Sequence, residues 1–212
     1  PIIYGMTIGE YALMINGEGW LKDNLVCDVN IVKNLLYSRH ESVDYSFSPP
    51  PSPNLRTMNA ISLYPSLCLF EGTLISVGRG SDTPFEIFGA PFLNQDVCSF
   101  SFLPKPNFGS NNPKYNNQLC YGWSLTSNTD VQFFQEKIEF NVLNLNYLIY
   151  AYQNTPDDYK SKFFNSFFNK LAGNNELQQQ IINGTDVMSI RKSWEGDLTD
   201  FKEIRMRYLL YD

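Results

Sequence analysis

The chain has 212 residues, of which 43% are hydrophobic, 15% aromatic and 18% charged, and its 16 basic and 22 acidic residues give a formal net charge of −6. A chain of this length buries about 70% of the surface that its unfolded form exposes, so this composition predicts a globular protein with a hydrophobic core. Lysines and arginines form no basic stripe for a nucleic-acid backbone, so we expect no nucleic-acid partner. No run of about 18 apolar residues is present, so we expect no segment that spans a membrane.

The first 32 residues predict a strand, a helix and a second strand. Residues 2–4 are apolar, as in a buried strand. Thr7 and Glu10 have the spacing of a capping box, so a helix should begin at Thr7 and end at Asn16-Gly17. Residues 28–32 alternate between polar and apolar, which predicts the second strand. This unit is too small to form a sheet alone, so we interpret it as the end of an amino-terminal α/β domain.

A proline-rich segment separates this unit from the rest of the chain. Residues 49–53 contain four prolines, which favour an extended backbone, so we predict two domains, residues 1–48 and 49–212. In the second domain, residues 58–72 predict a helix in which Pro65 must lie in the first turn or break the helix.

Short strands and terminal helices are predicted for the remainder. Gly, Pro and Asn are dense over residues 78–122, where aromatic runs such as residues 98–102 predict short strands between loops. Residues 140–152 and 187–208 have helical spacing. The predicted fold class is therefore α+β, with a mixed α/β carboxy-terminal domain after the α/β start.

Residues 78–80, Gly-Arg-Gly, have the features of an anion-binding loop. Glycine on both sides of Arg79 allows the positive φ that turns successive N–H groups toward one point, and a guanidinium can form two parallel hydrogen bonds with a carboxylate. The alternative is a glycine-rich turn in which Arg79 is solvated or paired with Asp82.

Four glutamates near turns are candidates for the paired carboxyl groups of a glycosidase: Glu10, Glu18, Glu71 and Glu86. Glu10 is explained equally well as the capping-box residue of its helix. Glu18 lies beyond the unfavourable end of the helix dipole, and it is either functional or an exposed loop charge. Glu71 follows an apolar run, where burial would raise the pKa of a general acid; the alternative is a helix-end charge satisfied by neighbouring N–H groups.

Asn54 and several aromatic residues are candidates for sugar contacts. Asn54 follows a proline and could hydrogen-bond a sugar hydroxyl or N-acetyl group, although an isolated asparagine there also suits a helix N-cap. Aromatic residues with polar neighbours could stack on a pyranose ring, although most aromatic residues of such a chain belong to the core. These residues are Tyr64, Phe85, Tyr121 and Trp123.

No cofactor is expected from the motifs. Cys27, Cys68, Cys98 and Cys120 lack C-x-x-C spacing and His40 is the sole histidine, which argues against a zinc site and favours buried free thiols over disulfides. The sequence contains no Walker loop, dinucleotide fingerprint or Gly-x-Ser-x-Gly elbow.

Eight blocks of sequence carry a family resemblance: Tyr4-Gly-Met-Thr-Ile-Gly-Glu10, Asn16-Gly-Glu18, Pro51-Ser-Pro-Asn54, Tyr64-Pro65, Glu71-Gly-Thr73, Gly78-Arg-Gly80, Pro84-Phe-Glu86 and Gly89-Ala-Pro91. In this order and spacing they resemble the carboxy-terminal half of the NamZ-type exo-β-N-acetylmuramidases, formerly a family of unknown function. The resemblance covers roughly residues 1–125 closely, and the helical end is similar mainly to the Bacteroides-like branch of the family.

The resemblance implies an exported protein, periplasmic or on the cell surface, that removes terminal N-acetylmuramic acid from the non-reducing end of peptidoglycan fragments. It implies a Rossmann-like amino-terminal domain, which residues 1–48 would complete, and a substrate cleft between this domain and a smaller carboxy-terminal one. The chain would form one wall of the cleft, with the missing amino-terminal domain as its partner. The alternative is a non-catalytic module that binds muropeptides or serves as a scaffold.

The resemblance also implies roles for the matching positions. The catalytic carboxylates would be Glu10 and Glu18, and the substrate-binding residues of the cleft would be Asn54, Glu71, Arg79 and Glu86. N-acetylmuramic acid carries a lactyl carboxylate, which is the expected partner of Arg79.

Overall fold

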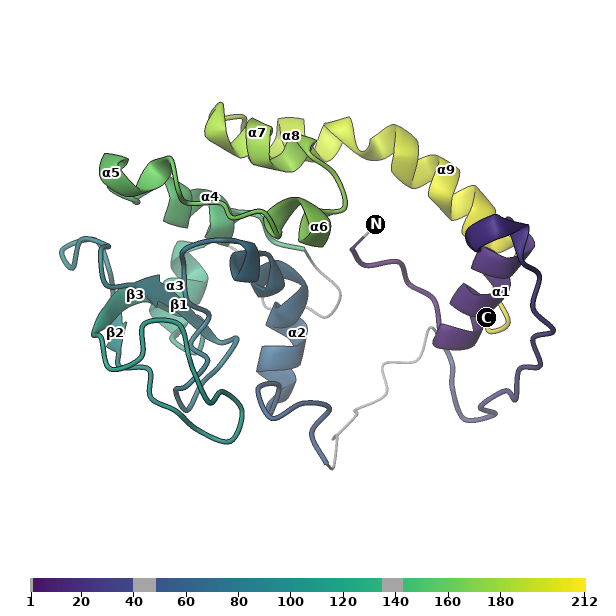
Figure 1. Ribbon diagram of the computed structural model, residues 1–212, viewed down its shortest axis with the longest axis horizontal. Coiled ribbons are helices and arrows are strands. Elements are labelled where there is room, and N and C mark those ends of the chain that lie inside the picture. Colours follow the sequence, from purple (N-terminus) through teal and green to yellow (C-terminus); the bar gives the residue numbers. More distant parts are fainter. Residues whose placement is uncertain (1, 40–48, 135–142) are drawn as a thin grey trace. The chain divides into compact units, whose positions relative to one another are not determined.

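The computed structural model describes residues 2–39, 49–134 and 143–212, which fall into two compact units (Figure 1). The first unit combines Ile3–Tyr45 with Met188–Asp212, and the second comprises Ser46–Val187. The regular elements of the described residues are short helices and a small antiparallel sheet, which confirms the predicted α+β class.

The first helix begins and ends as predicted. α1 (Ile8–Gly17) has Thr7 as its N-cap, whose hydroxyl accepts a hydrogen bond from the Glu10 N–H at 3.3 Å. The Glu10 carboxylate accepts one in return from the Thr7 N–H at 2.7 Å, so the capping box is complete. A single 3₁₀ turn, η1 (Lys22–Asn24), follows α1.

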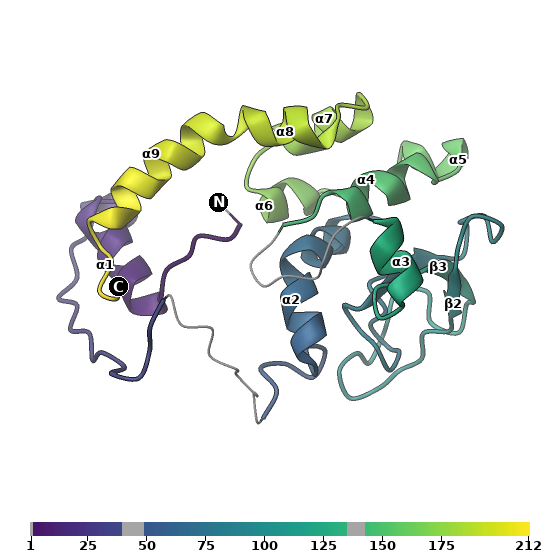
Figure 2. The same cartoon turned by 180° about the vertical axis from the view of Figure 1, so that it is seen from behind.

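A helix from the other end of the chain joins α1 in the first unit. α9 (Glu195–Met206) lies beside α1 (Figures 1 and 2). Just beyond α9, the Tyr208 hydroxyl donates a hydrogen bond to Glu18 at the end of α1. A Cβ on Gly17 would lie 2.5 Å from the Tyr208 hydroxyl oxygen, so glycine is what lets this tyrosine approach.

Residues 2–4 and 28–32 are not strands, so both of these predictions are wrong. The alternating pattern of residues 28–32 does separate an inner from an outer side, because Val29 and Ile31 are half-buried while Asp28 and Asn30 are exposed. A strand, however, needs a neighbouring strand to exchange backbone hydrogen bonds, and none of the described residues supplies one to this segment.

The second unit begins with a helix that passes through a proline. α2 (Met58–Leu67) continues directly into the 3₁₀ turn η2 (Cys68–Gly72). Pro65 lies in the last turn of α2, so the prediction that it would start or break the helix is wrong. A proline near a helix end removes one N–H donor, and the chain then tightens into i→i+3 hydrogen bonds, which limits the cost.

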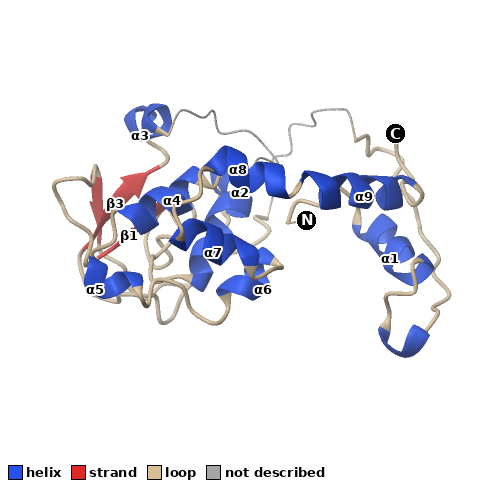
Figure 3. Cartoon of the chain, turned by 90° about the horizontal axis from the view of Figure 1, so that it is seen from above, coloured by secondary structure: helices blue, strands red, loops and turns tan. Residues whose placement is uncertain are grey.

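The sheet of the second unit has the strand order β1-β3-β2, with both pairs antiparallel. Its strands are β1 (Ile87–Ala90), β2 (Phe100–Phe102) and β3 (Cys120–Ser124). β2 confirms the strand predicted within residues 98–102. Figure 3 shows the strands in red among the helices of this unit.

Phe88 of β1 is at the centre of the core of the second unit. Its side chain is fully buried, and its ring centroid lies 5.0 Å from that of Phe70, 5.2 Å from that of Trp123 and 6.0 Å from that of Tyr147. Tyr147 belongs to α4 (Asn146–Gln153), so this helix packs on the sheet. Trp123 is therefore a core residue, as most aromatic residues are expected to be.

The carboxy-terminal third is helical, as predicted, but its helices are shorter than expected. The helix predicted over residues 140–152 is present as α4, and residues 140–142 lie outside the described residues. The single helix predicted over residues 187–208 is divided at Trp194, because the Trp194 N–H bonds to the carbonyl three residues earlier rather than four. The other helices are α3 (Asn128–Phe133), α5 (Asp157–Lys160), α6 (Phe168–Ala172), α7 (Glu176–Ile182) and α8 (Val187–Ser193).

Two further features bear on the sequence predictions. Within residues 2–39, 49–134 and 143–212, no helix is long and apolar enough to cross a lipid bilayer. The four cysteines are free; Cys120 is buried as expected, whereas Cys27 is exposed.

Replacing Gly122 of β3 by alanine should destabilise the second unit. A Cβ there would overlap the Phe88 carbonyl oxygen and lie 2.6 Å from the Gly89 Cα, so β1 and β3 would have to separate. We expect the free energy of unfolding to fall by about 2 kcal/mol or more. Gly196→Ala in α9 is the control, since open space surrounds its Cβ position and alanine there should be neutral or slightly stabilising. Thermal denaturation measures both, and an unchanged midpoint for Gly122→Ala would contradict the pairing of β1 with β3.

Candidate functional site

The loop of residues 78–80 has the backbone conformation that its sequence predicts. Gly78 and Gly80 have φ values of 72° and 87°, which L-residues rarely adopt. Side chains would not fit at either position, because a Cβ on Gly78 would overlap the Ile87 side chain and one on Gly80 would lie 2.7 Å from the Lys105 carbonyl oxygen. The N–H groups of Arg79 and Gly80 donate to no other described residue.

Arg79 forms an ion pair with Glu71, not with Asp82. The Arg79 Nη1 lies 3.1 Å from the Glu71 Oε1, so the alternatives of an Asp82 pair and of a glutamate satisfied by neighbouring N–H groups are both wrong. The two side chains are 44% and 29% exposed, so solvent reaches the pair. Ion pairs this exposed contribute little to stability, and an anionic ligand can compete for the arginine.

Tyr64 lies in the same neighbourhood as this ion pair. Its ring centroid is 5.0 Å from that of Phe85, which holds a strained φ of 60° and is buried. Burial raises the pKa of Tyr64, with the Glu71 charge adding to the rise and Arg79 opposing it. The phenol therefore stays protonated at neutral pH and remains a hydrogen-bond donor.

Lys114 is a further charged residue near Glu71 that the sequence reasoning missed. Its Nζ donates hydrogen bonds to the Thr73 and Ile75 carbonyls at 2.7 and 3.0 Å. Burial lowers the pKa of Lys114 to about 8, and the Glu71 charge opposes this effect. Nothing in the surrounding sequence marks this lysine, because a loop far along the chain brings it to residues 73–75. We refer to Tyr64, Glu71, Arg79 and Lys114 as the anion cluster.

Glu86 is buried and supports a helix cap. Its Oε1 accepts a hydrogen bond from the Thr57 hydroxyl at 2.7 Å, and the Thr57 hydroxyl oxygen in turn accepts one from the Ala60 N–H at 3.0 Å. Thr57 is the N-cap of α2, so the interpretation of Asn54 as an N-cap is wrong. Asn54 is instead buried, and its Nδ2 donates to the Gly109 carbonyl at 2.7 Å.

The carboxylate of Glu10 is fully buried, and each of its two oxygens accepts two hydrogen bonds. Arg39 Nη2 donates to its two oxygens at 2.7 and 2.9 Å, the Leu210 N–H donates to Oε1, and the Thr7 N–H donates to Oε2. Burial by itself would raise the pKa of Glu10, but the Leu210, Thr7 and Arg39 hydrogen bonds outweigh it and lower the pKa to about 2. A carboxylate in this state caps a helix and pairs with an arginine, and it is poorly suited to donate a proton.

Glu18 is held by residues that follow α9. Its Oε1 accepts a hydrogen bond from the Tyr208 hydroxyl at 2.6 Å and lies 3.1 Å from the Arg207 Nη2. Glu10 lies in the first turn of α1 and Glu18 is the C-cap of this helix, eight positions later, which corresponds to roughly 12 Å along the helix axis. The two carboxylates have different partners, since Glu10 is held by Arg39 and Leu210 whereas Glu18 is held by Tyr208 and Arg207.

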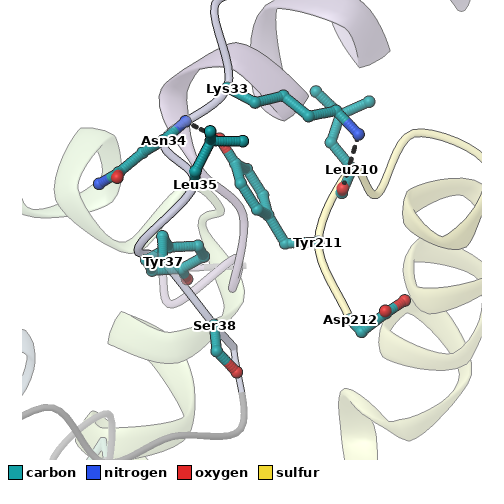
Figure 4. A pocket seen from close by; sticks show the side chains of 8 residues that line it. All are labelled: Lys33, Asn34, Leu35, Tyr37, Ser38, Leu210, Tyr211 and Asp212. Carbon is teal, nitrogen blue, oxygen red and sulfur yellow. Dashed lines mark hydrogen bonds between the residues drawn. The ribbon is translucent and has the colours of Figure 1, made fainter.

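The first unit also contains a pocket of about 290 Å³ between residues 33–38 and residues 210–212 (Figure 4). Lys33 Nζ donates to the Leu210 carbonyl at 3.1 Å, and the Asn34 N–H donates to the Tyr211 hydroxyl at 3.0 Å. These polar groups are therefore engaged with one another. None of the predicted site residues lines the pocket.

Comparison with family models identifies both parts of the chain. Residues 62–211 match the model described as "Exo-beta-N-acetylmuramidase NamZ, C-terminal", and residues 1–59 match the model of the corresponding N-terminal region. The chain is 34% identical over 222 aligned positions to the peptidoglycan beta-N-acetylmuramidase NamZ of Bacillus subtilis (strain 168). The match covers 100% of this chain and 51% of that protein, so the chain spans about half the length of the relative.

Two solved structures from Bacteroides fragilis NCTC 9343 have a similar fold. A DUF1343 family protein is 39% identical with a TM-score of 0.84, covering 98% of this chain and 56% of the other. A second DUF1343 family protein is 20% identical with a TM-score of 0.72, covering 99% of this chain and 57% of the other. At that identity, the second likeness concerns the fold alone.

Glu10→Gln should destabilise the first unit, because it leaves the Arg39 guanidinium part-buried without its carboxylate. Breaking a buried pair from one side costs about 3 kcal/mol in the free energy of unfolding. The pKa of Glu10 lies below its usual 4.5, so its contribution is fully present above pH 4.5 and is lost as the pH falls through about 2.

Thermal denaturation between pH 7 and pH 2 measures both effects. The unaltered chain should lose stability more steeply below pH 4.5 than Glu10→Gln, which has no carboxyl group to titrate at this position. Asp197→Asn, at an exposed position in the first turn of α9, is the control for the removal of one negative charge. Parallel pH profiles for the unaltered chain and Glu10→Gln would refute the low pKa of Glu10.

Proposed function

Because this chain belongs to the NamZ family of exo-β-N-acetylmuramidases, we propose that the protein it represents is a peptidoglycan-processing glycosidase that releases terminal N-acetylmuramic acid from cell-wall fragments. The chain spans about half the length of the Bacillus relative, so the activity is proposed for the whole protein. In this proposal the chain supplies one wall of the substrate cleft, and residues 1–48 complete a Rossmann-like amino-terminal domain.

The Glu71–Arg79 pair is the observation that carries this proposal. N-acetylmuramic acid differs from N-acetylglucosamine by a lactyl group with a carboxylate. Arg79 presents a half-exposed guanidinium beside two N–H groups that bond to no other described residue, and Lys114 adds a positive charge close to Glu71. A lactyl carboxylate would replace Glu71 as the partner of Arg79, and the N–H groups of Arg79 and Gly80 would add to its binding in this scheme.

The contacts narrow the proposed roles of the other residues. Arg79 binds substrate directly in this scheme and Glu71 holds Arg79 in place until substrate arrives, while Glu86 and Asn54 hold neighbouring segments in place. Glu18 remains the candidate catalytic carboxylate of the first unit, and the saturated contacts of Glu10 favour a positioning role for it. The second carboxyl group of the reaction would then come from elsewhere in the whole protein.

We also propose that the protein is exported and acts in the periplasm or at the cell surface. The substrate class supports this location, since peptidoglycan lies outside the cytoplasmic membrane.

The preference for the lactyl group can be tested on the chain itself. Calorimetric titration should show tighter binding of N-acetylmuramic acid than of N-acetylglucosamine, and Arg79→Ala should weaken the binding of N-acetylmuramic acid about tenfold or more while leaving that of N-acetylglucosamine nearly unchanged. Lys162→Ala, an exposed lysine in the same unit, is the control for the loss of one positive charge. Equal affinities of the unaltered chain for the two sugars would refute the anion cluster as a lactyl site.

Turnover must be tested on a protein as long as the relatives. Release of the chromophore from a chromogenic β-N-acetylmuramide is the expected result, with KM raised about tenfold or more in Arg79→Ala and kcat less affected. Saturable binding without release would instead favour the non-catalytic muropeptide-binding module.

A further inference from the structure

A tight turn next to the anion cluster displays an exposed aromatic ring. The turn runs from Asn107 to Ser110, whose backbones exchange two hydrogen bonds of 3.0 Å, and the Gly109 N–H donates to the Asn107 Oδ1 at 3.0 Å. Phe108 stands at its tip, and 91% of its surface is exposed. Scattered exposed apolar residues are ordinary, so exposure alone does not mark a site.

The turn is fixed to the rest of the second unit. Asn54 Nδ2 donates to the Gly109 carbonyl at 2.7 Å, and a side chain at Gly109 would collide with Asn54, which explains the glycine. Asn107 Nδ2 donates to the Ser81 carbonyl at 3.4 Å. The phenyl group is thus carried by a backbone held at several points, and a ligand that contacts it does not have to order the turn.

The same contacts place the turn beside the loop that carries Arg79. Ser81 directly follows residues 78–80, and the Lys105 N–H donates to the Gly80 carbonyl at 2.9 Å. Gly80 also packs against Pro113, on the far side of the turn in sequence. Residues 105–113 therefore lie against the loop that carries Arg79, within one compact unit.

The side chain of Asn54 is enclosed under the turn. Asn54 is 8% exposed, and its Oδ1 has no hydrogen-bond partner although its Nδ2 is bonded to the turn. The Oδ1 faces the Cα of Gly109, since a Cβ built there would lie 2.7 Å from it. This oxygen is enclosed and packs against Gly109, so Asn54 supports the turn from within and leaves the exposed side of the turn to Phe108.

We propose that Phe108 forms a second sugar subsite, in which its ring stacks on the apolar face of the N-acetylhexosamine that follows the N-acetylmuramic acid held by Arg79. The inference rests on the proposed function and extends it from one sugar to two. A pyranose offers a face of C–H groups with hydroxyl and amide groups around its edge, and this face suits stacking on an exposed aromatic ring held by a fixed turn. Asn54 acts in this subsite as a positioning residue, because it holds the turn.

The test uses two ligands and three substitutions of Phe108. The ligands are N-acetylmuramic acid and the disaccharide in which it is β-1,4-linked to N-acetylglucosamine, both titrated by calorimetry. Phe108→Ala should weaken disaccharide binding about tenfold and change monosaccharide binding less than about twofold. Phe108→Trp, which keeps an aromatic face, should bind as well as the unaltered chain, whereas Phe108→Leu, which is apolar but not aromatic, should behave like Phe108→Ala.

The role of Asn54 is measured by a double-mutant cycle. If Asn54 acts through Phe108, Asn54→Ala should weaken disaccharide binding, and the double variant Asn54→Ala, Phe108→Ala should bind no more weakly than Phe108→Ala alone. Thermal denaturation of each variant identifies any general loss of folding.

The outcomes separate this inference from the proposal on which it rests. Weaker monosaccharide binding in Arg79→Ala with unchanged disaccharide binding in Phe108→Ala would overturn the second subsite and leave the lactyl site standing. Full disaccharide binding by Phe108→Leu would also overturn it, because an apolar contact without ring stacking would then suffice. Absence of any binding of N-acetylmuramic acid to the unaltered chain would overturn both.

Discussion

The buried carboxylate of Glu10 is the interaction on which the first unit depends. It joins three stretches that are far apart in sequence: the start of α1 through Thr7, the segment before residue 40 through Arg39, and the end of the chain through Leu210. A buried charge is tolerated only when its hydrogen-bonding capacity is used, and here four bonds achieve this. The same bonds that make Glu10 a good anchor lower its pKa and make it a poor proton donor, so structural and catalytic roles compete at this position.

In the second unit, the ion pair of Glu71 and Arg79 is partly exposed rather than buried. Glu71 and Arg79 meet where solvent still reaches them, next to a loop whose glycines leave two N–H groups without a partner among the described residues. Exposed pairs of this kind contribute little to folding, so their geometry is available for binding. Lys114, whose ammonium group is held by the Thr73 and Ile75 carbonyls, adds positive charge near Glu71 and so favours the binding of a second anion beside it. In the anion cluster, the Glu71 carboxylate thus occupies the position on Arg79 that we propose for the carboxylate of a ligand. The fixed turn with Phe108 lies against the loop that carries Arg79.

Several features could be predicted because they depend on neighbours in sequence. The capping box of α1, the positive φ of Gly78 and Gly80 and the strand of residues 100–102 all follow from local spacing or from the conformational freedom of glycine. The order and spacing of the sequence blocks also indicated the family, which the family models confirm over residues 1–59 and 62–211. The strand pattern of residues 28–32 marked its inner side correctly, yet no strand forms, because pairing requires a partner that the described residues do not supply.

The sequence by itself therefore determined the family, the α+β class and the loop that carries Arg79. Only the tertiary structure decided the partner of each charge: Glu71 rather than Asp82 for Arg79, Tyr208 and Arg207 for Glu18, and Arg39 with Leu210 for Glu10. It also brought in Lys114 and Phe108, which no local pattern marks. The physical reason is that capping and backbone conformation act over a few residues, whereas ion pairs and buried hydrogen bonds join groups through space, and their choice of partner is fixed only when distant segments pack together.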